Sequence, residues 1–118
     1  MAAPAVTATR DCPLEAVVAH GGEGTIGFRR LVDDNGGGLN FVDLAEVPPG
    51  ASIGVHTHAG NQEEYYFVVD GTATMHLDGQ TVEVGTGDLV RNPPGGTHGL
   101  TNNGAEPVRL LVFEVAAP

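Results

Sequence analysis

A succession of short strand-like segments is the feature that most limits how this chain can fold. β-branched, aromatic and aliphatic residues gather in runs of four to nine residues, and each run ends at a Gly, Pro, Asn or Asp turn. The runs occupy residues 25–32, 39–47, 51–58, 64–69, 72–77, 81–84, 88–91, 98–101 and 108–115. Only residues 14–18 carry a short helix-like pattern. Nine short segments of this kind predict an all-β protein with a closed or double-sheet antiparallel architecture.

The length of 118 residues fits one domain, because a second core would be too small to be stable. Apolar residues make up 41% of the chain and charged residues 17%, a composition typical of a folded protein. Residues 1–24 show little periodicity, and Gly21, Gly22 and Gly24 precede the first strand-like run. We therefore expect an N-terminal arm over residues 1–24 and a single domain over residues 25–118.

The net charge of −10 argues against two classes of partner. The 15 acidic residues outnumber the 5 basic ones, and the resulting field repels nucleic-acid phosphates and anionic membrane surfaces. No apolar stretch approaches the roughly 18 residues of a membrane span, and the N-terminus lacks the pattern of a secretion signal. Cys12 is the only cysteine, which suits a reducing compartment. We therefore expect a cytoplasmic protein that binds neither nucleic acid nor membrane.

Two histidines lie one residue apart at the end of the third run. Side chains alternate between the faces of a strand, so His56 and His58 point to the same side, with the small Gly54 leaving space in front of them. Neutral imidazole is the commonest metal ligand. The pair alone is equally compatible with a chance occurrence on a polar sheet face.

Two carboxylates and a third histidine follow. Glu63 and Glu64 begin the next run, and only one of them can share a face with the histidines. Both faces of that run are apolar, so periodicity alone does not choose between them. His98 follows a Pro-Pro-Gly-Gly turn, which fixes where its side chain enters the fold. It predicts either a third ligand or a turn histidine in solvent.

These residues match two spaced patterns, G(X)5HXH(X)3–4E(X)6G and G(X)5PXG(X)2H(X)3N. The matching positions are Gly50, His56, His58, Glu64 and Gly71, then Gly87, Pro93, Gly95, His98 and Asn102. The patterns are the two motifs of the cupin superfamily, which this chain therefore resembles. The second motif is complete, whereas five residues instead of three or four separate His58 from Glu64. Glu63 would restore that spacing but break the later one, and we favour Glu64 because a loop absorbs an insertion more easily than a strand.

The resemblance implies a jelly-roll β-barrel, also called a double-stranded β-helix, with a metal bound by His56, His58, Glu64 and His98. Three imidazoles and one carboxylate leave two open positions on a six-coordinate ion such as Fe, Mn, Ni or Co. Zn and Cu are alternatives: four protein ligands would tend to close a tetrahedral Zn site, and Cu occurs in some relatives. The resemblance also implies a homodimer in which the N-terminal segments take part.

Residues in phase with these ligands are expected to line a substrate pocket. They include Gly54, Val68, Met75 and Leu100, which form a mostly hydrophobic wall suited to a compact organic molecule. Tyr66 could donate a proton to a bound ligand, or it could be a core tyrosine. Arg91 could bind a substrate carboxylate, or it could be a surface residue. His20 lies outside both motifs.

The favoured function is that of a metal-dependent enzyme acting on a small organic molecule. Members of the superfamily include dioxygenases, decarboxylases, isomerases and cyclases, and the fold does not choose among them. The chain resembles small single-domain cupins described as mannose-6-phosphate-isomerase-like or oxalate-binding. The alternatives are a protein that binds a metal and a small acid or sugar without turnover, and a structural barrel with a vestigial site.

Overall fold

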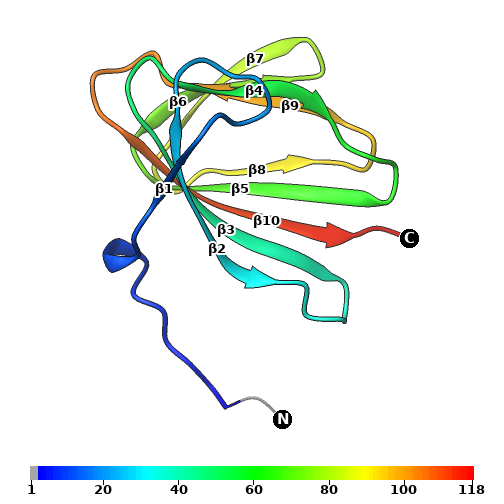
Figure 1. The fold of residues 1–118 in the computed structure, drawn as a ribbon. Coiled ribbons are helices and arrows are strands. Elements are labelled where there is room, and N and C mark those ends of the chain that lie inside the picture. The colour runs from blue at the N-terminus through cyan, green and yellow to red at the C-terminus, as the bar shows by residue number, and fades with distance from the viewer. Residues whose placement is uncertain (1–2) are drawn as a thin grey trace.

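The computed structural model describes residues 3–118 as two antiparallel sheets packed face to face. Figure 1 shows the four-stranded sheet above the six-stranded one. The larger sheet has the order β1 (Glu15–Val17), β2 (Ile26–Asp33), β3 (Leu39–Val47), β10 (Val108–Ala116), β5 (Gln62–Asp70) and β8 (Leu89–Asn92). The smaller sheet has the order β4 (Ser52–Thr57), β9 (Thr97–Thr101), β6 (Thr72–Leu77) and β7 (Gln80–Gly85). The predicted all-β, antiparallel jelly-roll architecture is confirmed.

The helix-like pattern at residues 14–18 does not form a helix. Glu15–Val17 forms β1 and pairs with β2, from Glu15 opposite Phe28 to Val17 opposite Ile26. The free edge of β2 supplies hydrogen-bond partners that a helix of five residues could not replace. The expected arm over residues 1–24 thus adds a strand to the larger sheet, and its first two residues lie outside the described part. Within the described residues, the 3-10 turn Thr9–Asp11 is the one helical segment.

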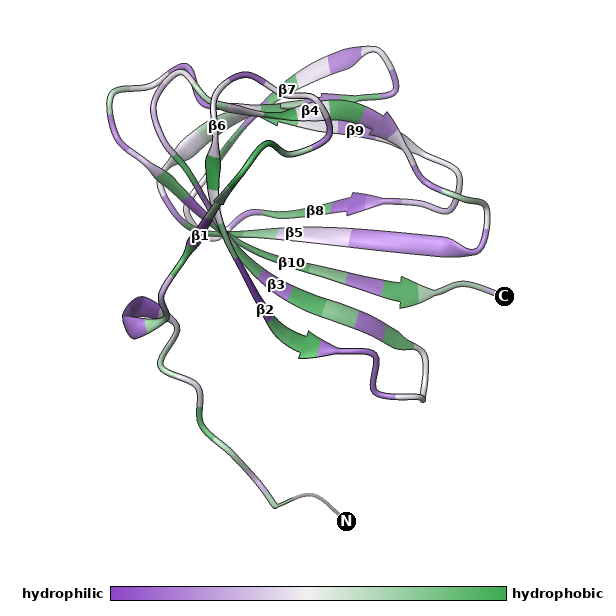
Figure 2. Cartoon of the chain, viewed as in Figure 1, coloured by the Kyte–Doolittle hydropathy of each residue, from purple (hydrophilic) through white to green (hydrophobic). Residues whose placement is uncertain are grey.

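The core lies between the two sheets. Along β10 the side chains of Val108, Leu110 and Val112 point inward and are buried, whereas those between them are partly exposed. Figure 2 shows hydrophobic stretches of β3 and β10 interrupted by hydrophilic residues. No helix within residues 3–118 is long and apolar enough to cross a membrane.

Strand register brings distant residues together at one end of the sandwich. Glu64 on β5 lies opposite Glu114 on β10, and His56 on β4 lies opposite His98 on β9. The pairing of β4 with β9 shifts between Ile53 and His56, where a bulge changes which residues face inward. Both Ile53 and His56 consequently face the space between the sheets.

Candidate metal centre

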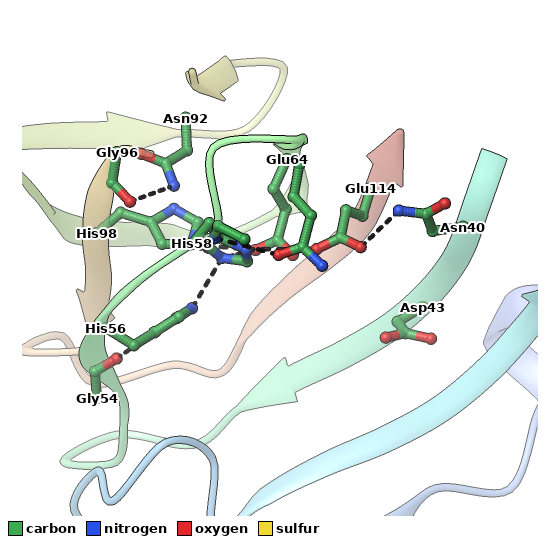
Figure 3. Close-up of polar contacts among 12 residues, drawn as sticks. Asn40, Asp43, Gly54, His56, His58, Glu64, Asn92, Gly96, His98 and Glu114 are labelled. Carbon is green, nitrogen blue, oxygen red and sulfur yellow. Dashed lines mark hydrogen bonds and ion pairs between the residues drawn. The ribbon is translucent and has the colours of Figure 1, made fainter. Parts of the chain in front are cut away.

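Four side chains converge where the two sheets face each other. His56 and His98 are partners across β4 and β9, Glu64 comes from β5, and His58 comes from the residues that follow β4. The ligand atoms of these residues all lie within 4.8 Å of one another. Figure 3 shows the four side chains pointing toward one another. Segments far apart in the sequence therefore form one cluster.

The spacing of the ligand atoms has the dimensions of a coordination shell. The Nε2 atom of His58 lies 3.1 Å from Nε2 of His56 and 3.1 Å from Nε2 of His98. The Oε1 atom of Glu64 lies 3.0 Å from Nε2 of His98 and 3.3 Å from Nε2 of His58. Two atoms bound at right angles to one ion, each about 2.1 Å from it, are about 3.0 Å apart.

Contacts on the outer side of the His56 and His58 rings determine which ring nitrogen faces the centre of the cluster. Nδ1 of His56 lies 2.7 Å from the carbonyl oxygen of Gly54, which can only accept, so this nitrogen carries the proton. Nδ1 of His58 approaches Oε1 of Glu114 at 3.3 Å, so the outer nitrogen of this ring faces a carboxylate. The ring of His56, with its proton on Nδ1, presents the lone pair of Nε2 to Nε2 of His58 at 3.1 Å. Three ring nitrogens and one carboxylate oxygen at this spacing form a donor set that fits a divalent transition metal.

Burial sets the protonation states of the ligands. It lowers the pKa of His56 to about 4 and that of His98 to about 4, so both imidazoles are neutral at physiological pH. Burial also raises the pKa of Glu64 to about 7, and the negative charge of Glu114 adds to the increase, although His58 opposes it. Neutral imidazoles and a poorly solvated carboxylate both favour a bound cation.

The two adjacent glutamates point to opposite faces of β5. Glu64 is buried within the cluster, whereas Glu63 forms an ion pair with Arg91 on neighbouring strand β8. The extra residue between His58 and Glu64 lies in the turn before β5, where Gln62 N donates to Ala59 O at 3.1 Å. The structure thus places Glu64 beside the histidines, in agreement with the motif spacing.

A model of the cupin domain matches residues 43–114, which is more than half of the chain. The chain belongs to the cupin family. The cupin is 33% identical over 66 residues to an oxalate-binding protein of Thermotoga maritima. It is 37% identical over 70 residues to an uncharacterized protein of Methanocaldococcus jannaschii. The two matches cover 56% and 58% of this chain, and 54% and 55% of the relatives, so this cupin matches about half the length of each.

Solved structures agree with the fold. A predicted oxalate decarboxylase from Thermotoga maritima superposes with a TM-score of 0.89 at 23% identity, over 95% of this chain and 99% of that chain. A cupin protein from Bacteroides fragilis superposes with a TM-score of 0.63 at 30% identity, over 68% of this chain and 67% of that one. At 23% identity, the first similarity concerns the fold and carries no information on activity.

A cavity of about 610 Å³ adjoins the ligand cluster of this cupin. Its wall includes His56, His58 and Glu64, together with Tyr66. The ring of Tyr66 lies 4.8 Å from that of His98, centroid to centroid. Burial raises the pKa of Tyr66 well above its usual value, so the phenol is neutral and can donate a hydrogen bond.

Most of the other residues that the sequence suggested for a pocket lie elsewhere. Val68, Met75 and Leu100 are fully buried in the core and are not part of the cavity wall. The ligands occupy one end of their strands, and residues further along in the same phase lie where the two sheets pack together. Arg91 is exposed and bound to Glu63. The structure therefore does not support contact of a substrate with Val68, Met75, Leu100 or Arg91.

Gly54 does not leave space in front of the histidines. The segment between β1 and β2 fills that space, because Gly54 N donates to Ala19 O at 2.9 Å. A Cβ built on Gly54 would overlap the carbonyl oxygen of His20 and lie 2.9 Å from the nitrogen of Gly22. The glycine therefore permits a close approach of two backbones.

Sequence reasoning missed two residues beside the cluster. His20 stacks on His56 with ring centroids 3.5 Å apart and an angle of 10° between the planes. Its loop is positioned by tertiary contacts, so nothing in the local sequence signals it. The inward position of Glu114 could have been inferred from the sequence, because this charged residue is in phase with the inward-facing Val112 along β10.

Proposed function

We propose that this cupin is a metal-dependent enzyme that acts on a small organic molecule. The observation that carries the proposal is the convergence of four ligand atoms within 4.8 Å beside a cavity of about 610 Å³. The ligands would be His56, His58, Glu64 and His98, and the metal would be Fe, Mn, Ni or Co. When bound, such an ion supplies Lewis-acid chemistry that polarises a carbonyl or carboxylate and acidifies water.

The chain supplies orientation and a hydrogen-bond donor. Glu114 and the carbonyl of Gly54 hold the rings of His58 and His56 so that their Nε2 atoms face one point. Tyr66 is a neutral phenol in the cavity wall, which supports a catalytic role in donating a hydrogen bond to an oxygen of the substrate. The candidate reactions are oxygenation, decarboxylation, isomerisation and cyclisation.

Elemental analysis followed by substrate screening tests this proposal. The protein is purified without added metal, its metal content is measured, and candidate acids and carbonyl compounds are offered with and without oxygen. Turnover with oxygen consumption would indicate a dioxygenase, and turnover without oxygen would indicate a lyase or isomerase. Turnover that persists in a His98→Ala variant stripped of metal would contradict the proposal.

A binding protein without turnover is the second candidate. It is favoured by the similarity to a protein named for oxalate binding, which covers 56% of this chain. A metal-loaded protein that retains a small acid or sugar through gel filtration, without chemical change of that ligand, would support this candidate over the enzyme.

We further propose that the protein is a cytoplasmic homodimer whose N-terminal arm, residues 1–24, adjoins the interface. The outer face of the larger sheet exposes Phe67, Val69 and Leu89, and pairing with a second copy would remove them from water. The single cysteine supports a reducing compartment. Light scattering on the intact chain and on a chain lacking residues 3–12 tests the dimer and the part of the arm in it.

A further inference from the structure

We infer that the substrate has one metal-binding polar head and an uncharged, largely apolar body, and that the site does not select a small dianion. This inference rests on the proposed function, because the head is held at the cluster of histidines and Glu64. It adds the chemical class of the rest of the substrate, which is read from the cavity wall away from the cluster.

The wall beyond the ligands is mostly hydrophobic. It is formed by β1 and the residues after it, by β2, β3 and β4, and by β10. The apolar side chains that define it are Val17, Ile26, Phe28, Phe41, Ile53 and Val112. These side chains offer dispersion contacts and a dry surface to a hydrocarbon chain or ring.

The charged groups of the wall oppose a second negative charge on the substrate. Asp43 and Glu114 are buried carboxylates that face the cavity. Arg30 is the one arginine in the wall. Its Nε and Nη2 atoms donate hydrogen bonds to the carboxylate of Asp43, at 2.8 and 3.1 Å. Its guanidinium also packs on the ring of Phe41, with Cζ 4.5 Å from the centroid. Arg30 is thus held against the wall with its charge balanced by Asp43, so a distal carboxylate would find no free guanidinium and would approach the carboxylate of Glu114.

The size of the cavity leads to the same class of substrate. Its volume of about 610 Å³ equals the liquid volume of about twenty water molecules. Oxalate, with its six non-hydrogen atoms, would leave most of this space filled with water. A body of five to ten carbon atoms would displace that water from the apolar wall and gain about fourfold in affinity for each methylene buried.

A matched series of 2-oxo acids on the cobalt-loaded protein tests the inference by calorimetry. Pyruvate, 2-oxopentanoate and 2-oxoglutarate share the same head and differ only in the tail. We expect 2-oxopentanoate to bind about fifteenfold more tightly than pyruvate, from two additional methylenes. We expect 2-oxoglutarate to bind at least about tenfold more weakly than 2-oxopentanoate. Equal affinities along the series, or tighter binding of 2-oxoglutarate, would overturn the inference.

Substitutions in the cavity wall test whether the preference for an apolar tail arises in the cavity. Phe28→Ala should reduce the gain in affinity from pyruvate to 2-oxopentanoate to less than about fourfold. Phe113→Ala is the matched control, because Phe113 stacks on Tyr65 and is not part of the cavity wall. Should Phe28→Ala fail to fold, Ala19→Leu fills the same cavity from its rim and should likewise abolish the gain. An unchanged gain in a folded cavity variant would overturn the inference.

Failure of this inference and failure of the proposed function give different results. A protein that takes up cobalt and binds pyruvate, but shows no preference for an apolar tail, contradicts the inference alone. A protein that takes up no cobalt, or whose bound cobalt does not affect the binding of any of the three acids, contradicts the proposed function and the inference with it.

Discussion

Nδ1 of His58 lies 3.3 Å from Oε1 of Glu114, a carboxylate from the last strand of the fold. The other oxygen of Glu114 accepts a hydrogen bond of 2.8 Å from Asn40, as Figure 3 shows. Residues of two other strands, β3 and β10, thus hold one imidazole ring. With Nδ1 of His58 beside Glu114, its Nε2 faces His56 and His98.

Replacing this carboxylate should weaken metal binding without removing a ligand. We expect Glu114→Gln to lower the affinity for Co(II) by about 10- to 100-fold, because a neutral amide beside the His58 ring would orient it less firmly than the carboxylate does. Competition with a chelator measures this affinity. The control is Glu83→Gln, at an exposed position on β7, which should leave the affinity unchanged. Equal affinities in the two variants would refute the orienting role of Glu114.

The choice between adjacent glutamates can be tested by two isosteric changes. Glu64→Gln should lose most of its metal, because the buried carboxylate that approaches His98 at 3.0 Å becomes neutral. Glu63→Gln should retain metal, since Glu63 instead pairs with Arg91. Elemental analysis of both proteins, purified in parallel, gives the answer. The reverse outcome would mean that Glu63 is the ligand.

Metal affinity should fall as the solution becomes acidic. The pKa of Glu64 is raised to about 7, so below pH 7 a proton competes with the metal for this carboxylate. Affinity should therefore fall by about tenfold per pH unit below 7. It should fall more steeply near pH 4, where His56 and His98 also take up protons. Calorimetric titrations at pH 5, 6, 7 and 8 check this, and an affinity that stays constant from pH 5 to 8 would contradict it.

A methyl group at Gly54 should destabilise the fold. The Cβ of Gly54→Ala would overlap the carbonyl oxygen of His20, so the segment between β1 and β2 would have to move. We expect the free energy of unfolding to decrease by about 1–3 kcal/mol, measured by urea denaturation. Gly60→Ala is the control, because a Cβ at Gly60 meets nothing within 4 Å. A change of less than about 0.5 kcal/mol in Gly54→Ala would show that the backbones are not in close contact.

The four clustered residues could be predicted from the sequence because their spacing matches the two cupin motifs. The motifs gave the positions of His56, His58 and His98, and the distance to Gly71 favoured Glu64 over Glu63. The strands were predictable for the same reason, since Gly, Pro and Asn/Asp turns mark their ends. Asp78-Gly79 is an example, with φ of 47° and 84° in the hairpin between β6 and β7.

The residues that line the cavity could not be predicted from the alternation of side chains along the strands alone. The register shift between Ile53 and His56 changes which residues of β4 face inward. No local sequence pattern indicates this shift. The segment that carries His20 is placed by its contact with Gly54, some thirty residues away. Leu100 shares its phase with His98 but lies further along β9, where it packs against the core instead of lining the cavity.

The most direct test is anomalous diffraction from crystals of protein purified without added metal. We predict one peak, about 2.0–2.3 Å from Nε2 of His56, His58 and His98 and from Oε1 of Glu64. The absence of a peak at this point in crystals soaked with Co(II), or a peak bound by other residues instead, would contradict it.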